Sequence, residues 1–281
     1  MAAKIIDGKL VAEDVLGRVR ARSAALREKG VSPCLAIVLV GDDPVSKRLV
    51  GIKMKNCERA DILCRFLPLP EETTEAELLA LIDSLNADEA VHGVLCQLPF
   101  PAHINEKTVM PRIMREKDVD AFSAIIGGDR EDMAACTPAG VMELLRYENI
   151  PVSGKNCVVV GRSAIVGKPM AMQLMLHDGT VTVCHTKTVN LKDVTTRADI
   201  LIVAAGSPRL ITADMVAPGA VVIDVGNNRD GEGRLCGDVD FDAVKEKAAY
   251  LTPVPGGVGP MTVAMLMQNT VTAAGRLSGL V

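Results

Sequence analysis

Short runs of apolar, often β-branched residues alternate along the chain with stretches in which apolar residues recur at helical spacing. The predicted strands cover residues 35–41, 62–67, 91–96, 157–161, 181–185, 200–205 and 221–226. Because strands and helices alternate, we predict an α/β fold whose sheets are largely parallel.

Polar caps, prolines and glycines indicate where helices begin and where loops lie. Asp43 followed by Pro44 is typical of an N-cap and a first helical residue, so a helix is expected to run to about residue 60. Further helices are predicted at residues 74–85, 138–147 and 261–276. Residues 253–260, Pro-Val-Pro-Gly-Gly-Val-Gly-Pro, predict a rigid loop that lets the backbone approach a ligand closely. The polar, irregular segment 115–136 is expected to cross between two halves of the chain.

Composition favours small-molecule chemistry in the cytoplasm. A net charge of −4 without a run of Lys or Arg gives no electrostatic footprint for nucleic acid or for an anionic membrane. Apolar runs such as 35–40 fall far short of the roughly 18 residues that a membrane span needs. Charges at Lys4 and Asp7 interrupt any secretory signal. The eight cysteines form no Cys-x-x-Cys pair, so we interpret them as reduced packing residues and predict no metal site. Zinc held by distant cysteines stays an alternative.

A modified phosphate-binding turn follows the predicted strand 157–161. Gly161, Ser163 and Gly167 leave space for the N–H groups of a helix N-terminus to face a pyrophosphate, and Pro169 indicates the start of that helix. The usual Gly-x-Gly-x-x-Gly spacing is absent, so an ordinary tight connection between strand and helix stays an alternative.

The residues after the next strand favour NADP over NAD. An NAD enzyme is expected to place Asp or Glu on the ribose there, whereas this chain has Cys-His185-Thr186-Lys187. The guanidinium of Arg162 can hold a phosphate through two hydrogen bonds, which also points to NADP. NAD remains an alternative, and His185 and Lys187 are equally well explained as a solvated strand end.

Six segments occur in the order and spacing of one enzyme family. They are Val40-Gly-Asp-Asp-Pro44, Gln97-Leu-Pro-Phe-Pro101, Lys117-Asp-Val-Asp120, Cys136-Thr-Pro-Ala-Gly140, Val160 to Pro169, and Pro253 to Thr262. Through them the chain resembles the bifunctional methylenetetrahydrofolate dehydrogenase/methenyltetrahydrofolate cyclohydrolase family along nearly its whole length.

The resemblance implies a homodimeric enzyme that binds one-carbon derivatives of tetrahydrofolate. It would oxidise 5,10-methylenetetrahydrofolate with NADP and hydrolyse the methenyl product to 10-formyltetrahydrofolate. The expected domains are an N-terminal α/β substrate domain, residues 1–137, and a Rossmann-like nucleotide domain with a parallel sheet, residues 138–260. A C-terminal helix, residues 261–281, is expected to pack back on the first domain.

The resemblance also assigns residues to three roles. The family's catalytic residues fall on Lys53, Gln97 and Asp120. Substrate contacts are expected from Leu49, Val50, Leu98, Pro99, Pro255, Gly256, Gly257 and Pro260. Cofactor contacts are expected from Gly161, Arg162, Ser163, Ile165, Val166, Gly167, His185, Thr186, Ala205, Gly206 and Asn227. Without the resemblance, Lys53 would be interpreted as a solvated lysine of an amphipathic helix, and Asp120 as a turn or cap residue.

The chain departs from the family pattern on the folate side. Leu49 stands where the family carries a tyrosine one helical turn before the lysine, and the segment 121–135 differs from the family sequence. Hydride loss needs little acid–base help, whereas hydrolysis needs an activated water and a protonated nitrogen. We therefore expect hydrolysis to be weakened more than hydride transfer. The alternatives are a non-catalytic paralogue that binds nucleotide or folate, and a dehydrogenase for another small acid.

Overall fold

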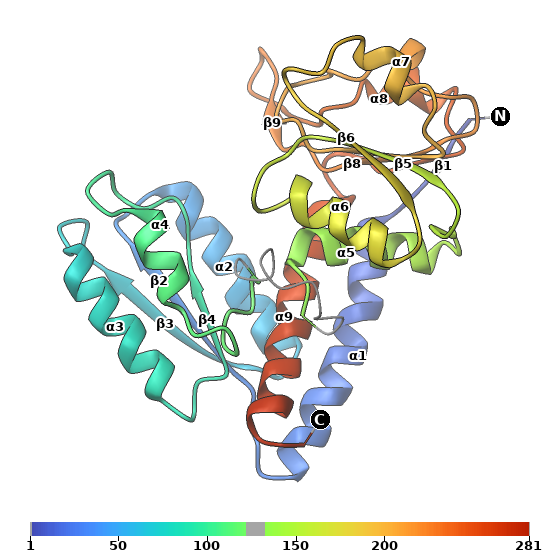
Figure 1. Ribbon diagram of the computed structural model, residues 1–281. Coiled ribbons are helices and arrows are strands. Elements are labelled where there is room, and N and C mark those ends of the chain that lie inside the picture. Colours follow the sequence, from blue (N-terminus) through green and yellow to red (C-terminus); the bar gives the residue numbers. More distant parts are fainter. Residues whose placement is uncertain (1, 122–132, 281) are drawn as a thin grey trace. The chain divides into compact units, whose positions relative to one another are not determined.

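The computed structural model describes residues 2–121 and 133–280, which form two compact units (Figure 1). Unit 1 consists of Met1–Ala12 and Thr137–Thr262, and unit 2 of Glu13–Cys136 and Val263–Val281. Each of three helices contains a boundary between the units: α1 (Gly8–Glu28), α5 (Cys136–Tyr147) and α9 (Val258–Leu277). The assignment of folate and nucleotide binding to residues 1–137 and 138–260 stays a prediction.

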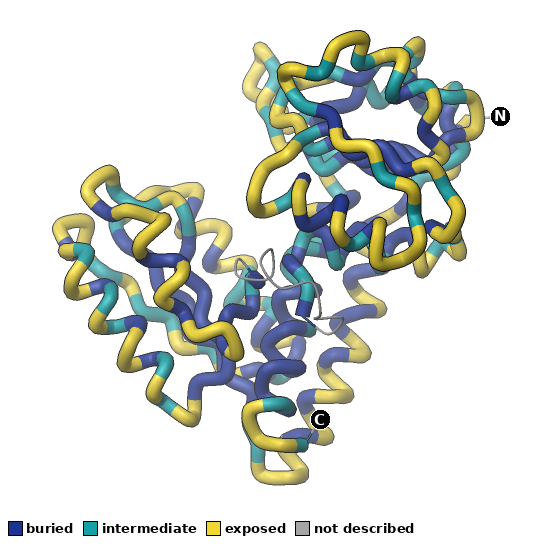
Figure 2. The backbone as a smooth tube through the Cα atoms, in the orientation of Figure 1, coloured by how far each residue is buried: buried dark blue, intermediate teal, exposed yellow. Residues whose placement is uncertain are grey.

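Unit 1 contains a six-stranded sheet in which every neighbouring pair is parallel. In spatial order its strands are β1 (Lys4–Ile5), β11 (Tyr250–Leu251), β8 (Val221–Asp224), β7 (Ile200–Val203), β5 (Asn156–Val160) and β6 (Thr180–Cys184). Every residue of β7 and β8 is buried, as expected for a sheet covered on both faces (Figure 2). Helices α5 and α6 (Gly167–Leu176) lie on one face, and α7 (Leu191–Thr195) and α8 (Phe241–Lys245) lie on the other (Figure 1).

The strand order of this sheet defines where a ligand would bind. β6 and β7 flank β5 on opposite sides, so the chain switches direction across the sheet at β5. Open α/β sheets bind ligands at the carboxyl ends of the strands beside such a switch point. The smaller elements of unit 1 are the 3-10 turn η3 (Ala213–Met215) and the antiparallel pair β9 (Asn228–Arg229) and β10 (Leu235–Cys236).

Unit 2 contains a three-stranded parallel sheet in the order β3 (Leu63–Leu69), β2 (Cys34–Val40) and β4 (Gly93–Cys96). Every residue of the central strand β2 is buried. Its alternate residues Cys34, Ala36, Val38 and Val40 belong to one core cluster, together with buried residues of α3 (Glu75–Ala87), α4 (Glu106–Val109) and η1 (Met110–Arg112). Helices α3 and α4 lie beside this sheet in Figure 1, where α2 (Pro44–Arg59) is also labelled.

Side-chain caps explain why two helices begin where the sequence predicts. The Asp43 carboxylate accepts the Ser46 N–H, and Pro44 is the first residue of α2. Thr74 and Glu77 form a reciprocal capping box at the start of α3. Both predicted helix starts are confirmed.

The seven predicted strands are present, and each of their ends lies within two residues of its predicted position. The five predicted helices are present as α2, α3, α5, α6 and α9, and α6 begins at Gly167, two residues before Pro169. One expectation was wrong in part, because α9 begins at Val258 and so takes up the end of the predicted loop 253–260. The 21-residue helix α1 was not predicted; the carboxylate of Asp7 caps it by accepting the N–H groups of Lys9 and Leu10. Within residues 2–121 and 133–280, no helix combines the length and apolarity that a membrane crossing requires.

Candidate functional site

Lys53, Gln97 and Asp120 gather at the carboxyl edge of the unit 2 sheet. α2 carries Lys53, and Gln97 directly follows β4. Lys53 Nζ donates to Gln97 Oε1 at 2.7 Å, and Gln97 Nε2 donates to the carbonyl of Leu98 at 2.7 Å. With both ends of its amide engaged, Gln97 fixes the direction in which the Lys53 amine points.

Asp120 reaches this edge because the segment before it extends the sheet. Val94 of β4 donates its N–H to the Lys117 carbonyl at 2.8 Å, and a parallel bridge joins Val94 to Asp118. The buried Lys117 ammonium donates to three backbone carbonyls at the end of α3, those of Leu85, Asn86 and Asp88, at 3.0, 2.8 and 2.7 Å. The lysine therefore satisfies carbonyls that a helix end leaves without an intrahelical partner.

Burial shifts the protonation of both charged members of the cluster. Burial lowers the pKa of Lys53, and the nearby Asp120 carboxylate partly opposes this shift. Burial likewise raises the pKa of Asp120, with Lys53 opposing. A lysine with a lowered pKa has more of its neutral, basic form at a given pH than a solvated lysine has.

The other predicted substrate residues of unit 2 have different environments. Leu49 is 42% exposed, one helical turn before Lys53. Val50 is buried, at 2% exposure, Leu98 is half-buried and Pro99 is exposed. Their contacts with a substrate stay predictions.

Only the ends of the altered segment 121–135 are described by the structure, since residues 122–132 lie outside the described part of the chain. Ala121 has φ of 57°, in the left-handed region that glycine adopts without a steric penalty. The sequence resemblance implies a glycine where this chain has Ala121, and the backbone geometry gives a physical reason for a glycine at this position.

The proline-glycine loop of unit 1 is tightly folded against the start of α1. Gly257 donates its N–H to the Pro253 carbonyl at 2.9 Å, and Gly256 has φ of 107°. A Cβ on Gly8 would lie 1.7 Å from the Gly257 carbonyl oxygen, so only glycine fits there. Pro255 is exposed and Pro260 is half-buried.

The turn between β5 and α6 lies at the switch point of the unit 1 sheet. Gly161 has φ of 128°, and a Cβ there would lie 2.1 Å from the carbonyl oxygen of Ala204, which follows β7. A Cβ on Gly167 would lie 2.3 Å from the Gly161 carbonyl oxygen. Ser163 Oγ accepts the N–H groups of Val166 and Gly167 at 3.2 and 3.3 Å. These contacts explain why small residues occur at the three positions identified from the sequence, and a turn of this tightness suits a dinucleotide.

Several predicted cofactor residues lie on strand ends or turns with exposed side chains: Arg162, Ile165, Thr186, Ala205 and Asn227. His185 is half-buried, and its Nδ1 accepts the Lys187 N–H at 3.1 Å. That bond leaves Nε2 as the protonated nitrogen of a neutral His185 ring.

Asp238 organises the loop after β7 and was not identified from the sequence. It is fully buried, and its carboxylate accepts the N–H groups of Ala205, Gly206 and Ser207 at 2.6, 3.0 and 2.8 Å. Its own N–H donates to the carboxylate of Asp224. Burial raises the pKa of Asp224 to about 6, and three backbone N–H donors partly oppose this shift. A possible signal for Asp238 is an acidic residue directly between Gly237 and the apolar Val239, but Asp240 and Asp242 follow closely, so the sequence does not single it out.

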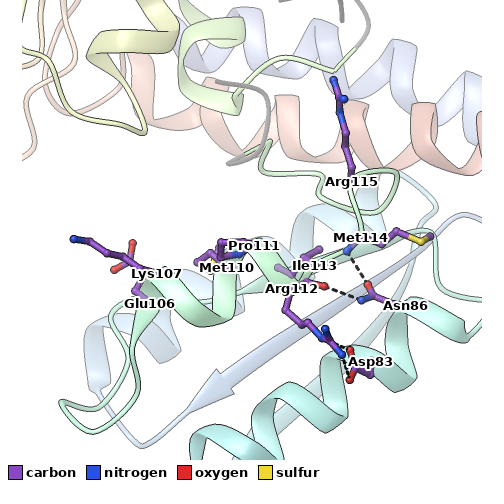
Figure 3. A pocket seen from close by; sticks show the side chains of 10 residues that line it. All are labelled: Asp83, Asn86, Glu106, Lys107, Met110, Pro111, Arg112, Ile113, Met114 and Arg115. Carbon is purple, nitrogen blue, oxygen red and sulfur yellow. Dashed lines mark hydrogen bonds and ion pairs between the residues drawn. The ribbon is translucent and has the colours of Figure 1, made fainter. Parts of the chain in front are cut away.

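A separate hollow of about 660 Å³ lies between α3, α4 and η1 in unit 2 (Figure 3). Its Arg112 and Asp83 form a doubly hydrogen-bonded ion pair at 2.6 and 2.7 Å. Asn86 bonds the backbone of Arg112 and of Met114. These polar groups are already paired with one another, and no residue of the Lys53 cluster lines the hollow.

Comparison with known proteins assigns the chain to a family. Residues 6–120 match the tetrahydrofolate dehydrogenase/cyclohydrolase catalytic domain, and residues 135–278 match the NAD(P)-binding domain of the same enzymes. The chain belongs to the tetrahydrofolate dehydrogenase/cyclohydrolase family. The resemblance inferred from six sequence segments is therefore confirmed, as is the predicted α/β fold with a parallel nucleotide-binding sheet.

Individual members of the family are similar over almost the whole chain. The bifunctional protein FolD of Agathobacter rectalis is 52% identical over 98% of this chain and 100% of its own length. The solved structure of the bifunctional enzyme FolD from Campylobacter jejuni is 45% identical, with a TM-score of 0.95 over 98% of this chain and 99% of its own. The Trypanosoma brucei FolD structure, complexed with NADP cofactor and inhibitor, is 37% identical, with a TM-score of 0.91 over 98% of both chains.

These similarities favour the bifunctional enzyme and give no support to a non-catalytic paralogue or to a different substrate. Across residues 2–121 and 133–280, no three His, Cys, Asp or Glu side chains come together as a metal site.

Proposed function

We propose that this chain oxidises 5,10-methylenetetrahydrofolate with NADP and hydrolyses the methenyl product to 10-formyltetrahydrofolate. The observation that carries the proposal is the hydrogen bond between Lys53 and Gln97 beside the half-buried Asp120, within the segment that matches the family's catalytic domain.

The oxidation requires positioning more than proton transfer. Bound NADP would accept a hydride from the methylene carbon and leave a cation stabilised by the two folate nitrogens. The chain's part is to hold the two rings together. On the nucleotide side we assign this to the turn of Gly161, Ser163 and Gly167, which leaves no room for a Cβ at either glycine.

The hydrolysis requires proton transfer, which we assign to unit 2. Water adds to the methenyl carbon, and a folate nitrogen takes up a proton as the C–N bond breaks. The neutral amine of Lys53, favoured by burial, accepts a proton from the attacking water and returns it to the folate nitrogen as the C–N bond breaks, while the hydroxyl proton of the adduct leaves to solvent as the formyl C=O forms. Gln97 keeps that amine in place, and Asp120 accepts hydrogen bonds from pterin N–H groups.

We infer a preference for NADP over NAD from the charges near the end of β6. No carboxylate stands among residues 184–187, and Arg162 is exposed on the turn after β5. The similar Trypanosoma brucei enzyme, which was solved with NADP, supports the same choice. On the basis of the family resemblance, we further propose that the chain is a cytoplasmic homodimer. Light scattering during gel filtration measures the mass of the assembly.

The test is a paired assay on the purified full chain. Reduction of NADP and of NAD is measured with 5,10-methylenetetrahydrofolate, and loss of methenyltetrahydrofolate is measured against the rate in buffer alone. We expect both activities, with a larger kcat/KM for NADP. Cofactor binding without any folate-dependent reduction would contradict the proposal. Lys53→Met serves as the matched variant, because methionine keeps the four-atom apolar part of the lysine side chain and removes the amine.

A further inference from the structure

Asn269 on the C-terminal helix α9 hydrogen-bonds the backbone next to Asp120, and no role in the reaction has been assigned to it so far. Asn269 of α9 is buried, at 1% exposure. Its Nδ2 donates to the Val119 carbonyl at 2.8 Å and to the Ala134 carbonyl at 3.0 Å. All three residues lie in unit 2. One amide group therefore hydrogen-bonds the backbone both directly before Asp120, at Val119, and 14 residues after it, at Ala134.

The orientation of this amide follows from its partners. Both neighbours are carbonyl oxygens, which only accept hydrogen bonds, so the nitrogen of Asn269 faces them. Its two N–H groups match the two carbonyls. A buried carbonyl without a donor is costly, so the two hydrogen bonds of Asn269 stabilise the backbone at Val119 and at Ala134 in these positions.

A second donor acts on the same carbonyl. Cys136, buried at the start of α5, donates its thiol to the Val119 carbonyl at 3.3 Å, and its thiol also interacts with the side chain of Asp120 itself. Its sulfur also lies 3.6 Å from Asn269 Nδ2. The Val119 carbonyl belongs to the peptide that leads into Asp120, so both donors act one bond away from the backbone of the pterin-binding residue.

We propose that Asn269 is a positioning residue for the folate reaction, which fixes Asp120 against the pterin by clamping the Val119 and Ala134 carbonyls. This proposal rests on the proposed function. Cys136 assists by holding the Val119 carbonyl from a second direction. The clamp acts on the folate side alone, since none of its contacts involves the cofactor turn of unit 1.

The test compares Asn269→Leu with Thr270→Val in the full-length protein. Leucine has a similar size and cannot donate. Thr270 is the next residue of α9 and is fully buried, and its hydroxyl donates to the Leu266 carbonyl within the helix at 2.8 Å. The control therefore perturbs the same buried helix and leaves the hydrogen bonds to Val119 and Ala134 in place.

We expect Asn269→Leu to raise the KM for 5,10-methylenetetrahydrofolate at least fivefold and to leave the Kd for NADP within twofold. Thr270→Val should leave both constants within twofold. An unchanged folate KM in Asn269→Leu, or an equal rise in Thr270→Val, would overturn the clamp. So would a parallel loss of folate and NADP binding in an Asn269→Leu protein that keeps a cooperative thermal transition, because the defect would then not be confined to the folate side.

Two further measurements separate the possible failures. If the wild-type chain shows neither activity, the proposed function fails, whatever Asn269 does. If Asn269→Leu has no cooperative thermal transition, Cys136→Ala decides the matter. A folate KM raised at least twofold with NADP binding intact supports the clamp, and an unchanged folate KM overturns it.

Discussion

Replacing Leu49 by tyrosine tests whether the departure of the chain from its family weakens hydrolysis. Leu49 lies one turn before Lys53 on α2 and is 42% exposed, so a larger ring has room there. The change restores a phenol on the face of the helix that carries the lysine. The intrinsic helix propensities of leucine and tyrosine differ by at most about 0.5 kcal/mol, so α2 should persist.

The expected gain follows from one hydrogen bond. Lys53 donates a hydrogen bond to Gln97 at 2.7 Å, and an amine can make further hydrogen bonds. A hydrogen bond contributes about 1 kcal/mol net. If that bond holds the amine in place as water attacks, it corresponds to about a fivefold rise in kcat for hydrolysis. Hydride transfer does not use the amine, so its kcat should change less than about twofold.

The assay measures both reactions on the same preparation, with Leu49→Phe as the control. Phenylalanine supplies the ring without the hydroxyl, so it should leave hydrolysis near the wild-type rate. Equal gains for phenylalanine and tyrosine would show that packing, and not the bond to Lys53, is responsible. A gain shared equally by both reactions would refute the separate roles given to positioning and proton transfer.

Three further predictions concern the amine and the cofactor turn. The rate of hydrolysis should rise with pH through a midpoint below 10.5, because burial lowers the pKa of Lys53 and the neutral amine therefore forms at lower pH. Lys53→Met should lose this rise with pH and should lower kcat at least about 100-fold. Stopped-flow measurements over a range of pH check both. Gly161→Ala should abolish NADP binding and lower Tm, because its Cβ would lie 2.1 Å from the Ala204 oxygen. Gly154→Ala, whose Cβ meets nothing within 4 Å, is the control and should lower only Tm, by less. Arg162→Gln should weaken NADP at least about tenfold relative to NAD in calorimetry, from the loss of a charged phosphate contact.

Local signals were sufficient to predict much of the fold. The cap at Asp43 and the capping box at Thr74 depend on residues three or fewer positions apart, so the sequence carries them directly. Buried parallel strands such as β7 are continuous apolar runs, which also makes them visible. The small residues Gly161 and Gly167 were recognised because a βα turn needs them within one short segment.

Residues that act across long stretches of sequence were missed. Asn269 binds carbonyls 150 and 135 positions away, and an isolated asparagine in a helix carries no mark of such partners. Asp238 binds the loop at Ala205 and Gly206 from more than 30 positions away. The helix α1 was missed for another reason: its apolar positions are separated by many charges, and tertiary packing stabilises it more than local propensity does.

Unit 2 contains two kinds of residues that affect the folate reaction: those that change the rate of hydrolysis and those that fix the position of Asp120. Leu49 is exposed, so a change there alters what the Lys53 amine contacts and leaves the core intact. Asn269 and Lys117 are buried and bind backbone carbonyls, so a change at either displaces the segment that carries Asp120. A kinetic defect without a loss of Tm is therefore expected for substitutions of the first kind. Substitutions of the second kind, at Asn269 or Lys117, should lower Tm and folate affinity together. Because position 49 is exposed and belongs to the first kind, a leucine in place of the family's tyrosine is compatible with an intact fold.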